Sequence, residues 1–116
     1  MRSDKGENLI VDLTFEFSLK IVRYTSQLEK ERQFVLARQL LRSGTGIGAN
    51  VREAQNAESK ADFIHKMKIA AKEADETEYW LMLIDKLENY PGCKDLLAEC
   101  SSIIRVLSKI IGSSRK

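Results

Sequence analysis

The residue types that most often carry chemistry are sparse in this chain and do not cluster along it. There is one histidine, His65, and there are two cysteines, Cys93 and Cys100, seven residues apart. On a helix that spacing places two side chains on one face about 10 Å apart along the axis, too far for a disulfide bond. A metal site or a cysteine–histidine nucleophile needs further partners. We therefore predict two small buried thiols, no metal and no cofactor.

Paired carboxylates offer a second route to chemistry. Glu73 and Glu76 lie three residues apart and would share one face of a helix. Acid–base catalysis by such a pair requires a pocket and a shifted pKa, whereas carboxylates at helical spacing are more often solvated or ion-paired. A four-helix di-metal site needs two Glu-x-x-His motifs, and the chain has only Asp62-x-x-His65. The sequence therefore favours a protein that is not an enzyme.

A glycine-rich stretch at residues 43–50 invites comparison with a phosphate-binding loop. Such a loop follows a strand and ends in Lys followed by Ser or Thr, and neither feature is present here. Apolar and small residues instead keep a helical phase from Leu40 to Val51. We predict that a helix continues through the stretch, at a cost of roughly 1 kcal/mol per glycine. Gly44 and Gly48 would then form a smooth patch for close packing of another helix.

Four segments carry apolar residues at the alternating spacing of three and four that is typical of amphipathic helices. They cover about 9–28, 31–54, 60–89 and 92–111. A content of 43% hydrophobic and 31% charged residues supports a packed core, while 6 Gly and 1 Pro are too few for an all-β fold. Because short connections favour antiparallel neighbours, we predict an all-α, antiparallel up-down-up-down four-helix bundle.

The connections between these segments carry signals of different strength. Ser59, with Asp62 three residues later, forms a capping-box pattern before the third segment. The sequence Tyr-Pro-Gly at 90–92 breaks the chain before the fourth, whereas the turn expected at Gln27–Lys30 contains no helix-breaking residue. The predicted organisation is a disordered tail at 1–8, the bundle at 9–111 and a disordered tail at 112–116.

The overall charge gives no clear signal for nucleic-acid binding. Nineteen basic and 17 acidic side chains leave a net charge of +2. A phosphate-binding surface would therefore need cations gathered in space rather than a large excess of them. The candidate phosphate-contacting residues are Arg23, Arg38, Arg42, Arg52, Lys66, Lys68 and Lys72.

Ion pairing within the chain is the alternative role for some of these cations. It follows if the second and third segments are antiparallel neighbours. The groups brought together would be Arg42 with Glu73 and Glu76, Arg38 with Glu78 and Trp80, and Arg52 and Glu53 with His65 and Lys66. Whether Arg38 and Arg42 face solvent or a carboxylate stays open at this point.

Residues 40–54, together with 62–64 and 71–81, resemble the four-helix-bundle family named for the 23S rRNA intervening sequence. The resemblance covers about 9–111 and departs from the family pattern at 28–29, where many relatives have a proline, and at Gly46, where they have serine. It implies short bacterial proteins that form closed pentameric rings. The chain is also similar to the accessory protein of diversity-generating retroelements, a basic pentameric barrel that binds nucleic acid and a reverse transcriptase.

The family signature falls on five polar residues: Arg42, Asn50, Glu53, Glu73 and Glu78. In a bundle, polar residues close to the apolar stripe most often fix the register of the helices through buried hydrogen bonds. We expect that role for these five, with RNA contact by Arg42 as the alternative.

We expect a non-enzymatic homo-oligomer, a homopentamer by resemblance, that binds RNA or DNA through basic surface repeated around a ring. The alternative is a protein-interaction scaffold, whose partner would contact apolar residues outside the core stripes: Phe15, Leu19, Val22, Ile69, Trp80 and Leu83. No apolar run approaches the roughly 20 residues that span a bilayer. Acidic residues interrupt any signal peptide at the start of the chain, so we expect no membrane partner and a cytoplasmic location.

Overall fold

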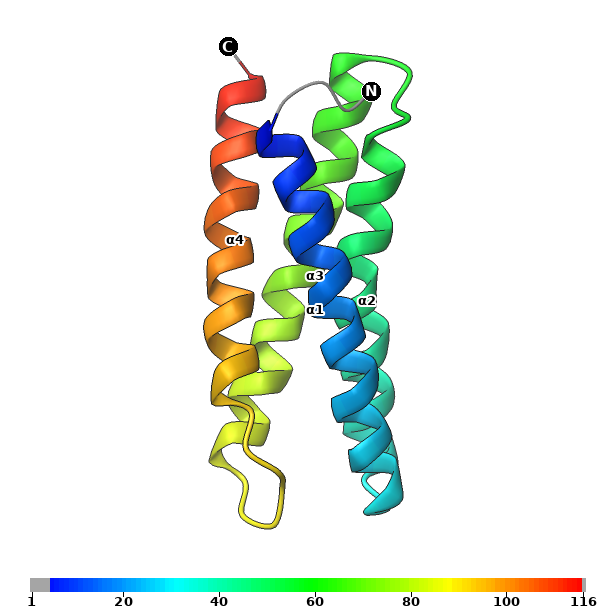
Figure 1. Ribbon diagram of the computed structural model, residues 1–116, viewed down its shortest axis with the longest axis vertical. Coiled ribbons are helices and arrows are strands. Elements are labelled where there is room, and N and C mark those ends of the chain that lie inside the picture. Colours follow the sequence, from blue (N-terminus) through cyan, green and yellow to red (C-terminus); the bar gives the residue numbers. More distant parts are fainter. Residues whose placement is uncertain (1–4, 116) are drawn as a thin grey trace.

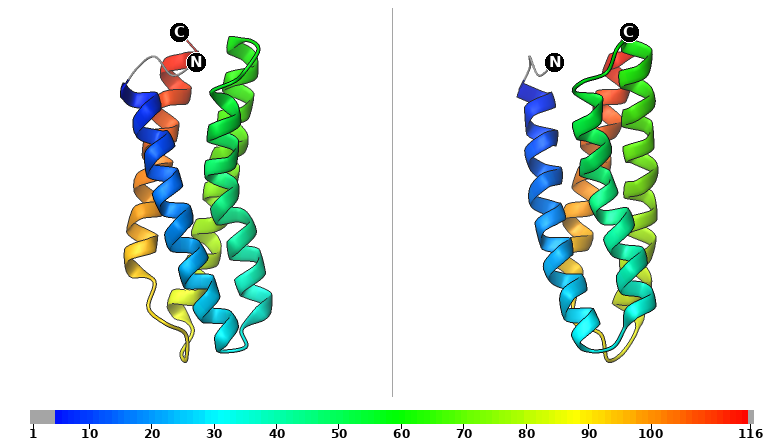
Figure 2. Two further views of the ribbon diagram at one scale, coloured as in Figure 1. Left: turned by 45° about the vertical axis from the view of Figure 1, so that its right-hand side comes forward. Right: turned by 90° about the vertical axis from the view of Figure 1, so that its right-hand side faces the viewer.

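The computed structural model describes residues 5–115 and contains four α-helices (Figure 1). They are α1 (Lys5–Lys30), α2 (Phe34–Ala54), α3 (Lys60–Lys86) and α4 (Lys94–Ser114), and the described chain has no strand. Each helix packs against the next, and α1 also packs against α4. The four rods lie side by side in a body of 46 × 20 × 19 Å (Figures 1 and 2). The predicted antiparallel up-down-up-down bundle is confirmed.

The helices extend further at both ends of the chain than the sequence pattern predicts. Residues 5–8 belong to α1 and residues 112–114 belong to α4, although both were expected to lie in disordered tails. The rest of those tails, apart from Arg115, lies outside the described residues. At the other end of the bundle α3 is shorter than expected and ends at Lys86.

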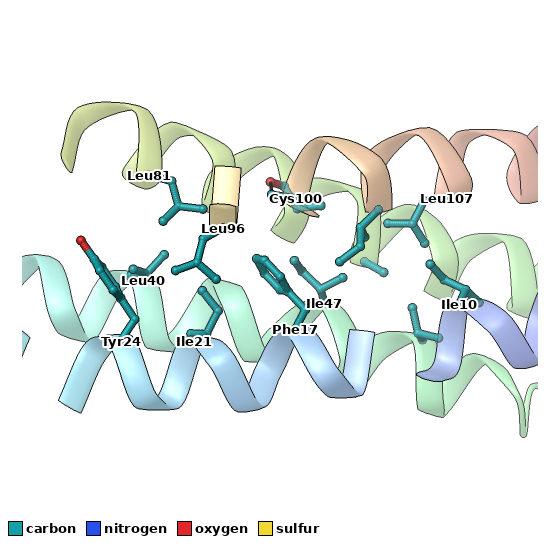
Figure 3. Close-up of a cluster of buried hydrophobic side chains, with 14 of the residues drawn as sticks. Ile10, Phe17, Ile21, Tyr24, Leu40, Ile47, Leu81, Leu96, Cys100 and Leu107 are labelled. Carbon is teal, nitrogen blue, oxygen red and sulfur yellow. Dashed lines mark hydrogen bonds between the residues drawn. The ribbon is translucent and has the colours of Figure 1, made fainter. Parts of the chain in front are cut away.

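The core is built from the predicted apolar stripes. Phe17 and Ile21 of α1 and Ile47 of α2 have no exposed surface, and their side chains point toward α4, where Leu96 lies opposite Ile21 (Figure 3). Both cysteines are buried and free, as predicted. A single continuous core therefore fixes the orientation of each helix, and the outward-facing side chains follow from it.

Helix α2 continues without interruption through the glycine-rich stretch, as predicted. A Cβ atom added at Gly44 would lie 2.9 Å from carbons of the Ile21 side chain. One added at Gly48 would lie 3.2 Å from the backbone oxygen of Thr14. The missing side chains thus let α1 lie directly against α2, and the stretch is a packing surface rather than a phosphate-binding loop.

The turn between α1 and α2 lies further along the chain than the predicted position at Gln27–Lys30, which is helical. Arg32 adopts a left-handed backbone conformation with φ of 64°. The N–H of Gln33 donates to the oxygen of Leu28 (2.8 Å), and that of Arg32 donates to the oxygen of Glu29 (2.9 Å). These two bonds form a Schellman motif, which usually has glycine at the left-handed residue. An arginine there gave no signal of a turn.

Replacing Arg32 with glycine is expected to raise the free energy of unfolding by about 0.5–1 kcal/mol. The left-handed conformation costs a residue with a side chain roughly 1–2 kcal/mol, and the greater freedom of glycine in the unfolded chain offsets part of the gain. Urea denaturation followed by circular dichroism measures the change. The control is Lys30→Gly in the last turn of α1, which should lower stability by up to about 1 kcal/mol. A loss of stability in both variants would contradict the prediction.

The start of α3 confirms the predicted cap. The Ser59 hydroxyl accepts a hydrogen bond from the N–H of Asp62 (3.0 Å). The carboxylate of Asp62 accepts in turn from the N–H of Glu58 (3.1 Å), one residue earlier than in the standard capping box. At the other end of α3, the break at 90–92 lies within the connection to α4, as predicted.

Candidate nucleic-acid interface

The structure places the seven candidate phosphate-contacting cations on three helices. Three lie on α2 (Arg38, Arg42 and Arg52), three on α3 (Lys66, Lys68 and Lys72) and one on α1 (Arg23). Because α2 and α3 are neighbours, six of the seven belong to one helix pair. Arg23 lies apart from them and lines a cleft between α1 and the start of α4.

Arg42 is neutralised within the chain. Its guanidinium forms an ion pair with Glu73 of α3 (3.4 Å) and a second, shorter one with Glu76. The same Glu76 carboxylate oxygen accepts a hydrogen bond from the indole N–H of Trp80 (3.1 Å). The predicted ion-pairing role is thus confirmed for Arg42. Both carboxylates of the candidate acid–base pair, Glu73 and Glu76, are therefore ion-paired with Arg42.

The remaining predicted ion pairs divide into one that forms and one that does not. The ammonium of Lys66 lies 3.1 Å from a carboxylate oxygen of Glu53, as expected for antiparallel neighbours. The predicted pair between Arg38 and Glu78 is wrong, because the Glu78 carboxylate faces α4 and accepts from the Ser101 hydroxyl (3.1 Å). Two residues at the same height along the bundle can still point to different neighbours.

Five candidates remain available to a ligand: Arg23, Arg38, Arg52, Lys68 and Lys72 are exposed, and none forms an ion pair with another residue of the described chain 5–115. Lys68 and Lys72 are four residues apart and therefore share one face of α3. A phosphate bound by these side chains would break no existing ion pair. Four of these five cations lie on the neighbouring helices α2 and α3.

Four of the five family-signature residues join neighbouring helices, but from the surface rather than from the core. Arg42 with Glu73 joins α2 to α3, and so does Glu53 with Lys66. Glu78 joins α3 to α4, whereas the Asn50 amide donates within α2 to the oxygen of Gly46 (2.9 Å). None of the five is fully buried, which corrects the expectation of buried hydrogen bonds.

The buried polar contact between α2 and α3 comes from two other residues. The hydroxyls of Ser43 and Thr77 are hydrogen-bonded at 2.9 Å, and neither residue has exposed surface. Thr77 lies on the apolar stripe of α3, which is the one sign of this contact in the sequence. A polar residue on such a stripe needs a partner when it is buried.

The cysteines have surroundings that disfavour reactivity. Burial, followed by the nearby Glu78 and Asp75 carboxylates, raises the pKa of the Cys100 thiol to about 12. Burial is also the main reason why the pKa of Cys93 is raised. Because the thiolate is the reactive form, both side chains stay protonated near neutral pH. Residues 5–115 contain no group of three side chains arranged to hold a metal ion, and no helix among them meets the length and hydrophobicity required to cross a membrane.

Several apolar side chains that lie outside the core gather in a groove between α3 and α4. The groove has a volume of about 400 Å³, and its apolar lining comes from Tyr79, Met82, Leu83 and Leu97. Tyr79 and Met82, which sequence reasoning missed, are more than half exposed. Of the apolar residues predicted to lie on the surface, Phe15, Val22 and Leu83 are exposed, whereas Leu19, Ile69 and Trp80 are half-buried.

Fold and surface together define a small bundle of amphipathic helices with unpaired cations on two neighbouring helices. Residues 7–109 match the sequence profile of the 23S rRNA-intervening sequence protein family, and the chain belongs to this family. It is similar to a protein of unknown function from the S23 ribosomal protein family of Bacteroides thetaiotaomicron, known from a crystal structure. The two are 43% identical, with a TM-score of 0.87, over 92% of this chain and 98% of the other. No match was found among curated proteins.

Proposed function

We propose that this protein is a non-enzymatic homo-oligomer that binds RNA or DNA through basic side chains repeated on each copy. The observation that carries the proposal is the set of exposed cations without an acidic partner, four of which lie on α2 and α3. Cations of this kind bind phosphates by releasing condensed counterions, whatever the base sequence. The proposed binding is therefore to the backbone and depends strongly on salt.

Assembly is part of the proposal because one copy carries little charge. A net charge of +2 produces a weak field, whereas several copies in one particle repeat the same patch and strengthen it. We propose that contacts between copies lie at the α3–α4 groove, because Tyr79, Met82 and Leu83 expose apolar surface there that a second copy would bury. The arrangement that the family resemblance implies is a ring of five.

The binding proposal predicts a steep loss of affinity for structured RNA as salt rises from about 50 to 200 mM. The double variant Lys68→Gln/Lys72→Gln should bind more weakly, and the slope of log affinity against log salt should fall by about 1.5, because each phosphate contact contributes about 0.7–0.9. Fluorescence anisotropy with a labelled RNA hairpin and with a DNA duplex measures both quantities.

A matched control removes the same charge from another helix. Arg105 and Lys109 of α4 are exposed, four residues apart and without an ion pair in the described chain. The variant Arg105→Gln/Lys109→Gln should keep most of the affinity and the slope. Equal losses in the two double variants would show that the α2–α3 surface has no special role. Absence of binding at about 50 mM salt would remove the nucleic-acid proposal.

Molar mass in solution tests the assembly. Light scattering should give a multiple of 13.2 kDa, and the 260/280 nm absorbance ratio before nuclease treatment reports nucleic acid that copurifies. A second candidate function, a protein-interaction scaffold, is favoured by the exposed apolar side chains of the α3–α4 groove. A monomer free of nucleic acid that retains one protein partner in a fixed ratio would support the scaffold instead.

A further inference from the structure

A second groove lies between α1 and α2, on the side of the bundle opposite to the α3–α4 groove. Its volume is about 290 Å³. Gly48 lies at its base, where a Cβ atom would come within 3.2 Å of the Ser18 hydroxyl oxygen. The absence of a side chain at Gly48 therefore lets α1 and α2 approach closely next to the groove. The residues that line the groove belong to α1 and α2.

One wall of the groove carries an exposed aromatic ring. Phe15 of α1 lines the groove and is 59% exposed, the largest exposed fraction among the aromatic side chains of the described chain. Burying such a ring against a flat aromatic ligand removes apolar surface from water and adds a stacking interaction. The groove thus offers a stacking surface at its rim.

Two hydroxyls in the groove are positioned to accept hydrogen bonds. Ser18 donates its hydroxyl proton to the oxygen of Thr14 (2.8 Å), and Thr45 donates its own to the oxygen of Leu41 (2.7 Å). Each hydroxyl has one proton, so what remains for a ligand is a pair of oxygen lone pairs. A ligand that fits these groups carries N–H donors.

The charge of the groove favours an anion. Arg52 is the only charged residue in its lining, is exposed, and forms no ion pair with another residue of the described chain. Among the residues whose side chains the structure describes, no carboxylate lines the groove to compete for the guanidinium. A ligand matching all three features has a flat aromatic part, amino groups and a phosphate.

We propose that the α1–α2 groove binds an unpaired nucleobase of single-stranded RNA or DNA. The base stacks on Phe15, its amino group donates to the hydroxyls of Ser18 and Thr45, and the adjoining phosphate contacts Arg52. Single-stranded nucleic acids are commonly held in this way, by aromatic stacking and cations together. The inference rests on the proposed function and adds to it the form of nucleic acid that each copy prefers.

The test compares a labelled ten-nucleotide adenine strand with a blunt duplex of the same length, using fluorescence anisotropy. Phe15→Ala should weaken single-strand binding about 10-fold or more, the size of effect found when a stacking residue is truncated, and leave duplex binding unchanged. Phe15→Leu, which keeps an apolar side chain, should lose almost as much, while Phe15→Tyr should retain affinity. The matched control is Phe34→Ala, since Phe34 is also exposed but lies outside the groove.

Each outcome decides for or against the base site. Equal affinity of wild type and Phe15→Ala for the single strand overturns it, as does an equal loss for strand and duplex. A fall in molar mass in Phe15→Ala also overturns it, because a second copy would then cover the groove. If wild type binds only the duplex, the base site fails while the proposed function survives. Absence of binding to both removes the two proposals together.

Discussion

Gly44→Leu is expected to lower the free energy of unfolding by about 3 kcal/mol, although leucine is the better helix former by almost 1 kcal/mol. A Cβ atom at residue 44 would lie 2.9 Å from two carbons of Ile21. Ile21 has no exposed surface, so its branched side chain has no free space into which to move. The larger side chain must push α1 away from α2, and overpacking of this kind typically costs 1–3 kcal/mol or more.

The same substitution at Gly112 provides the control. Gly112 also lies within a helix, but a Cβ atom there would have no neighbour within 4 Å. Gly112→Leu should therefore leave stability unchanged or raise it by a few tenths of a kcal/mol, because only helix propensity changes. Urea denaturation of both variants gives the comparison. Similar effects at the two positions would mean that α1 does not press against α2 at Gly44.

The bundle was predictable because helical periodicity reports directly which residues face a core. Leu40, Ile47 and Val51 have no exposed surface, as their spacing implied, and Gly44 between them lies at the contact with α1. The spacing also showed that the glycines interrupt neither the stripe nor the helix. The same logic correctly placed Arg42 beside Glu73, since antiparallel neighbours joined by a short turn have a fixed register.

Other features depend on three-dimensional detail that spacing does not carry. The turn at Arg32 is stabilised by backbone hydrogen bonds, and arginine occupies the position where glycine usually marks such a motif, so the sequence carries no sign of it. The antiparallel register predicted that Glu78 lies beside Arg38, because the two residues are at the same level along the bundle. The Glu78 side chain instead points from α3 toward α4, where it accepts a hydrogen bond from Ser101. Grooves arise from pairs of helices, which explains why Tyr79 and Met82 drew no attention before α3 and α4 were brought together.

The unequal distribution of charge along α3 also makes sense once its neighbours are known. Lysines are concentrated in the first half of the helix and carboxylates in the second, which is the reverse of the order that the helix dipole favours. The end turns, where the dipole acts most strongly, do follow it, with Asp62 in the first turn and Lys86 in the last. Cross-helix contacts offset this arrangement: Lys66 pairs with Glu53, and Glu73 pairs with Arg42. Arg42 thereby compensates part of the negative charge in the second half of α3, whereas Lys68 and Lys72 form no ion pair with another residue of the described chain and stay exposed.

Phe17→Ala is expected to lower the free energy of unfolding by about 3–5 kcal/mol, the usual cost of truncating a buried phenylalanine. Phe17 has no exposed surface and lies among Ile21, Ile47 and Cys100 at the centre of the bundle (Figure 3). Its removal leaves a cavity in the core, and the cost depends on how far the neighbouring side chains can relax into it. For a domain that is stable by roughly 5–15 kcal/mol, this is a large fraction of the total.

Phe15→Ala is the matched comparison, two residues away on the same helix. Because Phe15 is exposed, its truncation should change the free energy of unfolding by less than about 0.5 kcal/mol. Urea denaturation at two protein concentrations measures both variants and separates folding from assembly. If Phe15→Ala proves as damaging as Phe17→Ala, and more so at high concentration, then another copy buries Phe15. The core and the assembly would then share α1, and the α1–α2 groove would be a subunit contact.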